Sequence, residues 1–541
     1  MAADEKLDEP HESSPLYRDK LDGDGRPDPK SVSLNPAAFS PTNIPAIVSK
    51  QPRGFTWLLL SALIGMGTLI RVPQLSHSLN EAYAFRQTQT AFIIQKYATD
   101  GINLLTTPLP VFGKNSNVPM EFPLFQALGA LLVHTGITPD VAARLLALIS
   151  FQASGWILAL ILLRWHGRTV AIVAIALFEF LPYGLFWGTA SLIDFFSVAL
   201  ALAMVYFLDR WFSGGSTLTL LIGSVAAVLA FLVKPTTAPS WSLLLLVSAA
   251  MVIHQNGWRV PLKRLISGFL AGPGLGVAAA TIWTAYADFI KAKNPLTEFL
   301  TSPALRDWNF GTAAQRVDPN VYFTILNRVS VHITGPLMIS LSLGVAAAVV
   351  LDNPAERLST WGWLLVAISA PLVFLNLYVI HTYYLIAIYP ALVTVMAIGI
   401  VWAARLLTRL RRQRLAVAVL GTVAVFVATS GSLEARDDIT GLIHGEPLPK
   451  TSVAIRELTP SGSHIIMVGC DWDPTTLYYA QREGVMFRDP TAGRFWEREH
   501  IADYPFMFSC EDGMNPRRWL PAGYTAVAYG TPGLYRVVRK N

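Results

Sequence analysis

Apolar runs long enough to cross a lipid bilayer recur along most of this 541-residue chain, and no other feature constrains its fold as strongly. A membrane-spanning helix needs about 20 mostly apolar residues. Such runs fall between Phe55 and Gly431, in a chain that is 52% hydrophobic and only 14% charged. A soluble protein of this length carries nearly twice that share of charge. The sequence therefore predicts an α-helical polytopic membrane protein and excludes a soluble enzyme with one anchor.

The positions of the basic residues predict how the helices cross the membrane. Charged segments such as the run RLLTRLRRQR (Arg405–Arg414) fall in alternate loops, which is the positive-inside pattern of a chain with a cytoplasmic N-terminus. This topology accounts for much of the net charge of +6, so we expect no nucleic-acid partner. We predict about 11 transmembrane helices, at residues 54–72, 142–163, 169–187, 190–208, 217–233, 239–254, 265–287, 331–351, 360–380, 382–404 and 415–431.

Three parts of the chain follow from this topology. A polar start rich in Pro, Ser and Asp predicts a disordered cytoplasmic tail. With eleven spans the C-terminus lies outside the cell membrane, where short strand-like runs between turn signals predict a small extracytoplasmic α/β domain. The predicted parts are the tail (1–53), the transmembrane domain (54–431) with long outer loops at 73–140 and 288–330, and the C-terminal domain (432–541).

Two features of the C-terminal domain bear on its chemistry. The only cysteines, Cys470 and Cys510, are candidates for a disulfide in an oxidising compartment, the alternative being two buried thiols. Asp471 and Asp473 in CDWDP resemble the paired acids that hold a metal and a nucleotide in soluble transferases. No nucleotide pool exists outside the cytoplasm, so we expect these two acids to serve loop structure or packing.

Ionisable and aromatic side chains gather near the predicted outer ends of the spans. They are Glu81, Arg86 and Gln87 after the first span, Glu121 later in the first loop, Asp194, Lys234, His381, Tyr383 and Tyr384. Charges at such depth are costly, so each is a functional candidate. Each also has a structural alternative, since a lysine can extend to the interface, an aspartate can cap a helix and tyrosines can form an interfacial belt.

The chemistry of this set predicts glycosyl transfer. A carboxylate can take a proton from an attacking hydroxyl, acting as a general base. Arg, Lys and His side chains can stabilise the charge that develops on a departing phosphate. Together with apolar surface for a lipid tail, these groups predict transfer from a lipid-phosphate sugar to a hydroxyl at the outer membrane face. The alternative is a transporter or flippase that binds a lipid-linked saccharide through the same basic groups.

Several stretches, in this order, resemble the GT-C superfamily of polytopic glycosyltransferases, and more narrowly bacterial family 39-like enzymes related to protein O-mannosyltransferases and the lipid A aminoarabinose transferase. The resemblance covers roughly 54–430. It rests on an acid after the first span and on AFRQTQTA (Ala84–Ala91), MEFPLFQ (Met120–Gln126), AARLLALI (Ala142–Ile149), LVKPTTAP (Leu232–Pro239) and HTYYLIAIYP (His381–Pro390).

The resemblance implies an inverting transferase that uses a polyprenyl-phosphate sugar, with the acid of the first loop as base. Glu81 matches that position, although relatives carry an Asp after the Arg-Gln pair where this chain has Thr88 and Gln89. The base is therefore left open among Glu81, Asp194 and Glu121, ranked in that order.

We predict a glycosyltransferase of the bacterial inner membrane that modifies a cell-envelope glycan, lipid or protein. No residues have the spacing of a dedicated metal site, and dependence on a divalent metal is left open. The residues expected to bind the donor phosphate or substrate are Arg86, Gln87, Lys234, His381, Tyr383 and Tyr384.

Overall fold

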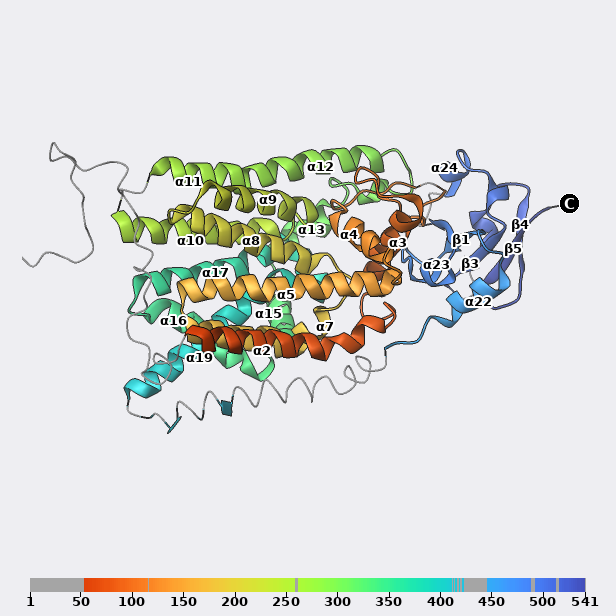
Figure 1. Ribbon diagram of the computed structural model, residues 1–541. Coiled ribbons are helices and arrows are strands. Elements are labelled where there is room, and N and C mark those ends of the chain that lie inside the picture. The colour runs from red at the N-terminus through yellow and green to blue at the C-terminus, as the bar shows by residue number, and fades with distance from the viewer. Residues whose placement is uncertain are drawn as a thin grey trace, which may run out of the picture. The chain divides into compact units, whose positions relative to one another are not determined.

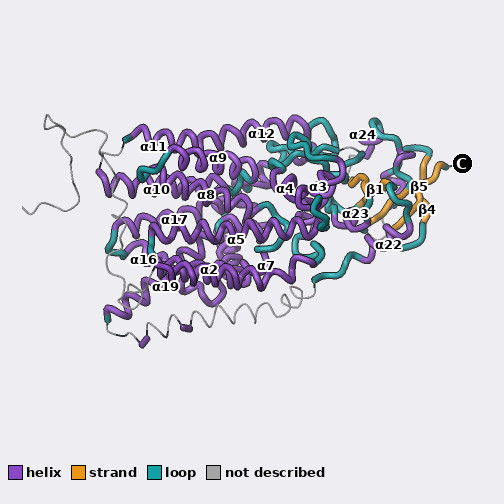
Figure 2. The backbone as a smooth tube through the Cα atoms, in the orientation of Figure 1, coloured by secondary structure: helices purple, strands orange, loops and turns teal. Residues whose placement is uncertain are grey.

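The computed structural model describes residues 53–540 apart from 115, 258–260, most of 411–444, 488–491 and 512–514. The predicted tail and most of the eleventh predicted span lie outside these residues. The described chain forms a bundle of long helices and a small sheet (Figures 1 and 2). Among the described residues, seven helical stretches are long and apolar enough to cross a membrane: Gly54–Ser76, Pro139–Trp165, Asp194–Phe212, Ala238–Asn256, Leu262–Lys291, Pro319–Val350 and Tyr389–Arg409.

Each of the first ten predicted spans overlaps one helix of the bundle or a pair of them, and seven of the ten coincide with the membrane-length stretches; the spans at 169–187, 217–233 and 360–380 do not. Backbone polar groups in lipid must be satisfied within the segment, which is why apolar runs of this length become helices. The α-helices are α2 (Arg53–Arg71), α3 (Ala84–Asp100), α4 (Leu124–Val133), α5 (Pro139–Trp165), α6 (Arg168–Phe180), α7 (Pro182–Trp187), α8 (Asp194–Phe212), α9 (Thr217–Val233), α10 (Ala238–Asn256), α11 (Leu262–Phe269), α12 (Leu275–Lys291), α13 (Arg306–Phe310), α14 (Ala313–Val317), α15 (Pro319–Val329), α16 (Met338–Val350), α17 (Pro354–Val373), α18 (Leu375–Ile380) and α19 (Tyr389–Arg409).

Shorter helical turns join several of these helices. Two of them, η4 and η6, are π-helical. Within single membrane-length stretches, η4 joins α11 to α12, and η6 with the 3-10 turn η7 joins α15 to α16. The turns are η2 (Val72–Ser76), η4 (Leu270–Gly274), η5 (Glu298–Leu300), η6 (Ser330–Thr334), η7 (Gly335–Leu337) and η8 (Thr382–Ala387).

The C-terminal domain is the predicted small α/β unit. Its five-stranded sheet has the order β2-β1-β3-β5-β4, with β1 parallel to β2 and β3, and β5 antiparallel to β3 and β4. The elements are α22 (Lys450–Leu458), β1 (His464–Val468), α23 (Thr475–Ala480), β2 (Glu483–Phe487), α24 (Ala492–Trp496), η9 (Ile501–Asp503), β3 (Phe506–Ser509), η10 (Pro516–Trp519), β4 (Tyr524–Ala528) and β5 (Leu534–Arg539).

The sheet docks on the segment between α2 and α4. Backbone hydrogen bonds join Gly484 N to Pro110 O (2.9 Å) and Met486 N to Val111 O (2.8 Å), so this segment pairs with the outer edge of β2. Thr88 of α3 and Thr475 of α23 share a hydroxyl–hydroxyl hydrogen bond of 3.1 Å. The buried apolar side chains of α3 and of the sheet form one common core. The loop that follows β1 is therefore held against the α3 end of the bundle.

Candidate functional site

A cavity of about 580 Å³ collects side chains from segments far apart in the sequence. Helix α3, the end of α9, the turn η8 and the loop after β1 all contribute to its wall. The sequence-predicted residues in this wall are Arg86, Glu121, Lys234, His381, Tyr383 and Tyr384. Asp194 lines a smaller pocket that shares Arg86 and Glu121 with this wall.

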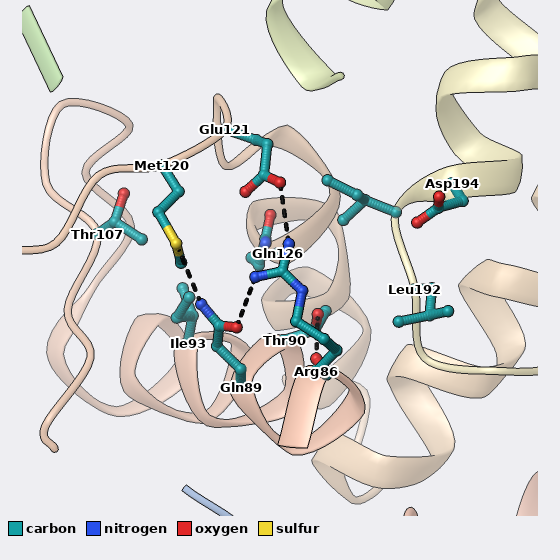
Figure 3. A pocket seen from close by; sticks show the side chains of 11 residues that line it. Arg86, Gln89, Thr90, Ile93, Thr107, Met120, Glu121, Gln126, Leu192 and Asp194 are labelled. Atoms are coloured by element: carbon teal, nitrogen blue, oxygen red, sulfur yellow. Dashed lines mark hydrogen bonds and ion pairs between the residues drawn. The ribbon is translucent and has the colours of Figure 1, made fainter. Parts of the chain in front are cut away.

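Two ion pairs dominate the electrostatics of the cavity. Arg86 Nη2 lies 3.1 Å from Glu121 Oε1, and Lys234 Nζ lies 2.7 Å from Asp194 Oδ1. Arg86 also donates to Gln89 Oε1 at 2.9 Å, and Figure 3 shows its guanidinium directed between Gln89 and Glu121. Arg86 and Lys234, the two cations predicted to bind phosphate, are thus already partnered by acids.

The pKa of Glu121 reflects these neighbours. Burial favours the neutral carboxyl, but the positive charges of Arg86 and Lys234 outweigh burial and lower the pKa of Glu121. Glu121 is therefore a carboxylate at neutral pH. Burial, assisted by Arg86, lowers the pKa of the His381 ring to about 4. His381 is therefore neutral at neutral pH, and it can exchange hydrogen bonds with a ligand but contributes no charge.

The ion pair Lys234–Asp194 joins the end of α9 to the start of α8. Lys234 follows the last residue of α9, which cannot continue into Pro235. Asp194 is the first residue of α8, where the helix dipole favours a carboxylate. Phe122 N donates to Leu232 O at 3.1 Å, and this bond brings the neighbouring Glu121 to the same end of α9.

Aromatic rings form the surroundings of Lys234. Its Nζ lies 5.2 Å from the ring centroid of Tyr384 and 5.7 Å from that of Tyr383, within the range of cation–π attraction. The two tyrosine rings stack at 4.5 Å, and the His381 ring stacks on Tyr383 at 5.3 Å. The sequence HTYY thus supplies one continuous aromatic wall.

Besides Asp194, two predicted catalytic or binding residues, Glu81 and Gln87, lie outside the cavity wall. Glu81, ranked first among the candidate bases, has its Oε1 2.9 Å from Arg144 Nη2, and the Arg144 side chain is almost fully buried. The side-chain amide of Gln87 donates to Glu81 Oε1 at 3.0 Å and accepts from Ser191 N at 2.8 Å. These two residues therefore tie the turn before α3 to the loop before α8. Gln87 thereby contacts the loop that leads into α8, whose first residue is Asp194.

The cavity also contains residues that the sequence reasoning missed. Lys291, at the end of α12, lies 3.1 Å from Asp288 and donates to Leu300 O at 2.6 Å. Trp308, Asn309 and Trp472 come from α13 and from the loop after β1. Lys291 could have been found from the sequence, because it is a basic residue just after an apolar run. The other three depend on how distant segments dock, and no local pattern reveals that.

Both acids of CDWDP line the cavity, but their surroundings differ. The Asp473 carboxylate accepts a hydrogen bond from Thr475 N at 2.9 Å at the start of α23, which agrees with the expected role in loop structure. Asp471 is exposed, has a left-handed backbone (φ 50°) and lines the cavity. The structure joins Cys470 and Cys510 in a disulfide, as proposed from the sequence. Within the described residues, no three His, Cys, Asp or Glu side chains gather as a metal site.

Comparisons with known proteins place the fold. No protein-family model matches the chain, and no curated protein sequence matches it. A similar solved structure is ArnT from Cupriavidus metallidurans bound to undecaprenyl phosphate, with a TM-score of 0.58 and 13% identity over 90% of this chain and 98% of that chain. Another is the archaeal oligosaccharyltransferase AglB from Archaeoglobus fulgidus, in complex with an inhibitory peptide and a dolichol-phosphate, with a TM-score of 0.51 and 12% identity over 84% of this chain and 69% of that chain.

These likenesses define the class of fold. ArnT and AglB are members of the GT-C superfamily, and the ArnT chain is covered almost from end to end. The predicted architecture, a polytopic helical membrane protein of GT-C-like fold with a small C-terminal α/β domain, is therefore confirmed. At 13% identity the likeness concerns the fold.

Proposed function

We propose that this protein is a membrane glycosyltransferase that moves a sugar from a polyprenyl-phosphate donor to a hydroxyl of a cell-envelope glycan, lipid or protein. The observation that carries the proposal is one cavity with Arg86, Glu121 and Lys234 at its wall, beside a smaller pocket lined by Asp194, the ion-pair partner of Lys234. The structures of ArnT with undecaprenyl phosphate and of AglB with dolichol-phosphate support this class of donor.

An apolar groove offers room for the lipid tail. It has a volume of about 490 Å³ and is lined by residues of α9, α10 and α12 and the segment between α9 and α10. Pro235 and Thr284 line both the groove and the cavity, so the two spaces adjoin. A polyprenyl chain in the groove would bring its phosphate to the cations at the cavity wall. Apolar burial would hold the tail, and the cations would hold the head group.

The ion pairs suggest how donor binding prepares the site. A phosphate that enters the cavity competes with Glu121 for Arg86 and with Asp194 for Lys234. Charge-assisted bonds to phosphate are strong enough for such an exchange. A carboxylate released from its cation has a higher pKa, because the nearby positive charge no longer favours its ionised form. Donor binding would therefore turn a weak base into a stronger one.

The proposed transfer step uses these groups in order. The acceptor oxygen forms a bond to the sugar's anomeric carbon while the bond from that carbon to the phosphate oxygen breaks. The acceptor proton passes to a carboxylate, and the electron pair leaves with the phosphate. Arg86 and Lys234 stabilise the charge on the departing phosphate. Attack opposite the leaving group inverts the anomeric centre.

We propose a different order of the candidate bases, which rests on the pocket that each one lines. Glu121 lines the large cavity directly, Asp194 lines the smaller pocket beside it, and Glu81 lines neither. We therefore place Glu121 first and Asp194 second. We further propose that the protein lies in the bacterial inner membrane, with a cytoplasmic N-terminus and a cavity that opens to the extracytoplasmic side. On that side a donor delivered by the membrane replaces nucleotide sugars.

A complementation experiment tests the proposal. In a deletion strain, mass spectrometry identifies the missing envelope glycan, and the wild-type gene restores it. We expect Glu121→Gln to lower restoration by roughly 10²-fold or more, the usual contribution of a general base. Purified Glu121→Gln protein should still bind undecaprenyl phosphate. Asp352→Asn, which alters an exposed ion pair with Arg409, is the control and should restore the glycan fully.

Two results would contradict the proposal. Full restoration by both Glu121→Gln and Asp194→Asn would remove the acid-base chemistry. Wild-type protein in liposomes that moves a labelled lipid-linked saccharide across the bilayer without ever cleaving it would favour the transporter alternative.

A further inference from the structure

Five rings that line the cavity contact one another in a row. Phe299 lies 6.3 Å from Trp472, which lies 6.1 Å from Phe85. Phe85 lies 6.0 Å from His381, and His381 lies 6.0 Å from Trp308. We call these five residues the aromatic belt. They belong to α3, η5, α13, the residue after α18 and the loop after β1, so the belt exists only once the C-terminal domain has docked.

Polar side chains accompany the belt at its two tryptophans. Asp471 precedes Trp472, and Asn309 follows Trp308, and both line the cavity. Asp471 is exposed and holds a left-handed backbone conformation (φ 50°), which a residue other than glycine seldom adopts. Such conformations cluster at ligand-binding sites, where surrounding contacts stabilise them.

The loop after β1 is fixed before any ligand arrives. The disulfide to Cys510 holds Cys470, and the bond from Thr475 N holds Asp473. Between them Trp472 contacts three phenylalanine rings, the third being Phe112 at 6.3 Å. Since little ordering is left to do on binding, this loop can present Asp471 and Trp472 at low entropic cost.

A sugar ring matches this combination of groups. One face of a pyranose or furanose is covered by C–H bonds that pack on aromatic rings, and its hydroxyls need carboxylate or amide partners. The two ion pairs provide for a phosphate, but they leave the sugar without an apolar platform. We propose that the aromatic belt, with Asp471 and Asn309, forms a saccharide subsite for one sugar ring of the donor or the acceptor. The inference rests on the proposed function for the source of that sugar.

Binding to immobilised saccharides tests the subsite. The probe is an array of hexoses, pentoses and amino sugars found in bacterial envelope glycans, and the protein is the full chain in detergent. We expect Trp472→Ala and Trp308→Ala each to weaken saccharide binding on the order of tenfold, as for truncation of a central aromatic contact. Binding of undecaprenyl phosphate should change less than about twofold.

A matched control separates the subsite from a general effect of removing tryptophan. Trp361 on α17 is exposed to 44%, as is Trp308, and it does not line the cavity. Trp361→Ala should bind saccharide like the wild type. If Trp472→Ala fails to fold, Trp308→Ala and Asp471→Asn decide the question. Competition by undecaprenyl phosphate carrying the same sugar indicates the donor as the source, and a lack of competition indicates the acceptor.

Three outcomes overturn the inference. They are a wild-type protein that binds no saccharide on the array, tryptophan variants that bind like the wild type, and an equal loss in Trp361→Ala. Saccharide binding by wild-type protein that does not bind undecaprenyl phosphate leaves the subsite standing and removes the proposed donor. The two proposals can therefore fail separately.

Discussion

The ion pairs of this protein differ in whether a ligand can reach them. Arg86 and Lys234 hold acids at cavity walls, where the proposed donor phosphate would displace them. Arg144 holds Glu81 in a different setting, since its guanidinium also donates to His77 O at 3.2 Å and Ser78 O at 2.6 Å. An ion pair embedded in backbone hydrogen bonds stabilises a turn. Because the Arg144–Glu81 pair lines neither pocket, we expect no ligand to exchange with it.

This contrast leads to a prediction for Glu81. Glu81→Gln removes the charge opposite the buried Arg144 but leaves the backbone acceptors of Arg144 in place. We expect unfolding in detergent to become easier by about 1–3 kcal/mol, the cost of weakening a buried charged bond. Transfer activity per folded molecule should stay near that of the wild type. A complete loss of activity in well-folded Glu81→Gln protein would restore Glu81 as the leading base.

The sequence indicates the positions of some candidate residues for a physical reason. Lys234, Asp194 and His381 each stand at a helix end, and the alternation of basic loops assigns those ends to one side of the membrane. Pairing partners are different, because they depend on side-chain geometry after packing. No feature of the sequence near Glu81 indicates Arg144 as its partner. The order that we propose for the bases depends on which pocket each acid lines, and the sequence does not contain that information.

At the scale of helices, glycines decide which pairs approach closely. A Cβ atom added to Gly399 of α19 would overlap the Ser340 carbonyl and the Gly344 nitrogen of α16, and one added to Gly344 would overlap Val395. In lipid, helices gain little from apolar burial, and small residues that allow close backbone contact stabilise their packing. Gly344 and Gly399 thus set the contact between α16 and α19.

We predict that Gly399→Ala destabilises the bundle. The added methyl group forces α16 and α19 apart, at a cost of roughly 1–3 kcal/mol, as for overpacking elsewhere. Gly65→Ala in α2 is the matched control, because no atom lies within 4 Å of its added Cβ. Thermal unfolding in detergent should show a lower midpoint for Gly399→Ala and no decrease for Gly65→Ala. Equal midpoints for the two variants would mean that α16 and α19 tolerate separation.

At the scale of the whole molecule, the C-terminal domain completes the cavity. Hydropathy and turn signals predict that the domain exists, and β1 and β4 fall within the runs that suggested strands. The same signals carry no information about docking, which uses backbone hydrogen bonds at Pro110 and Val111. The contribution of Trp472 to the cavity was hidden for this reason.

The docking surface has a charge contact that makes it sensitive to pH. Lys96 Nζ of α3 lies 2.7 Å from Glu483 Oε1 of β2, and His464 Nε2 lies 3.7 Å from the other carboxylate oxygen. The His464 side chain and the Lys96 ammonium, against the effect of burial, lower the pKa of Glu483 to about 2. In an unfolded chain a glutamate titrates near 4.3. The folded state therefore favours the ionised Glu483.

The sign of the pH dependence follows from this lowered pKa. The stabilisation from Glu483 is fully present above about pH 4.3 and is lost as the pH falls towards 2, where the folded carboxylate takes up its proton. We expect Glu483→Gln to lower the unfolding midpoint relative to wild type by a constant amount from pH 7 to about pH 5. That difference should shrink to about half near pH 3.

Lys114→Gln is the control for this experiment. Lys114 lies 3.9 Å from Asp503 at an exposed site, so its removal should have little effect on the unfolding midpoint at any pH. The contrary result is a difference in unfolding midpoint between wild type and Glu483→Gln that is equal at pH 7 and pH 3. It would show that Glu483 titrates alike in the folded and unfolded chain. The ionic contact between α3 and the sheet would then contribute nothing to docking.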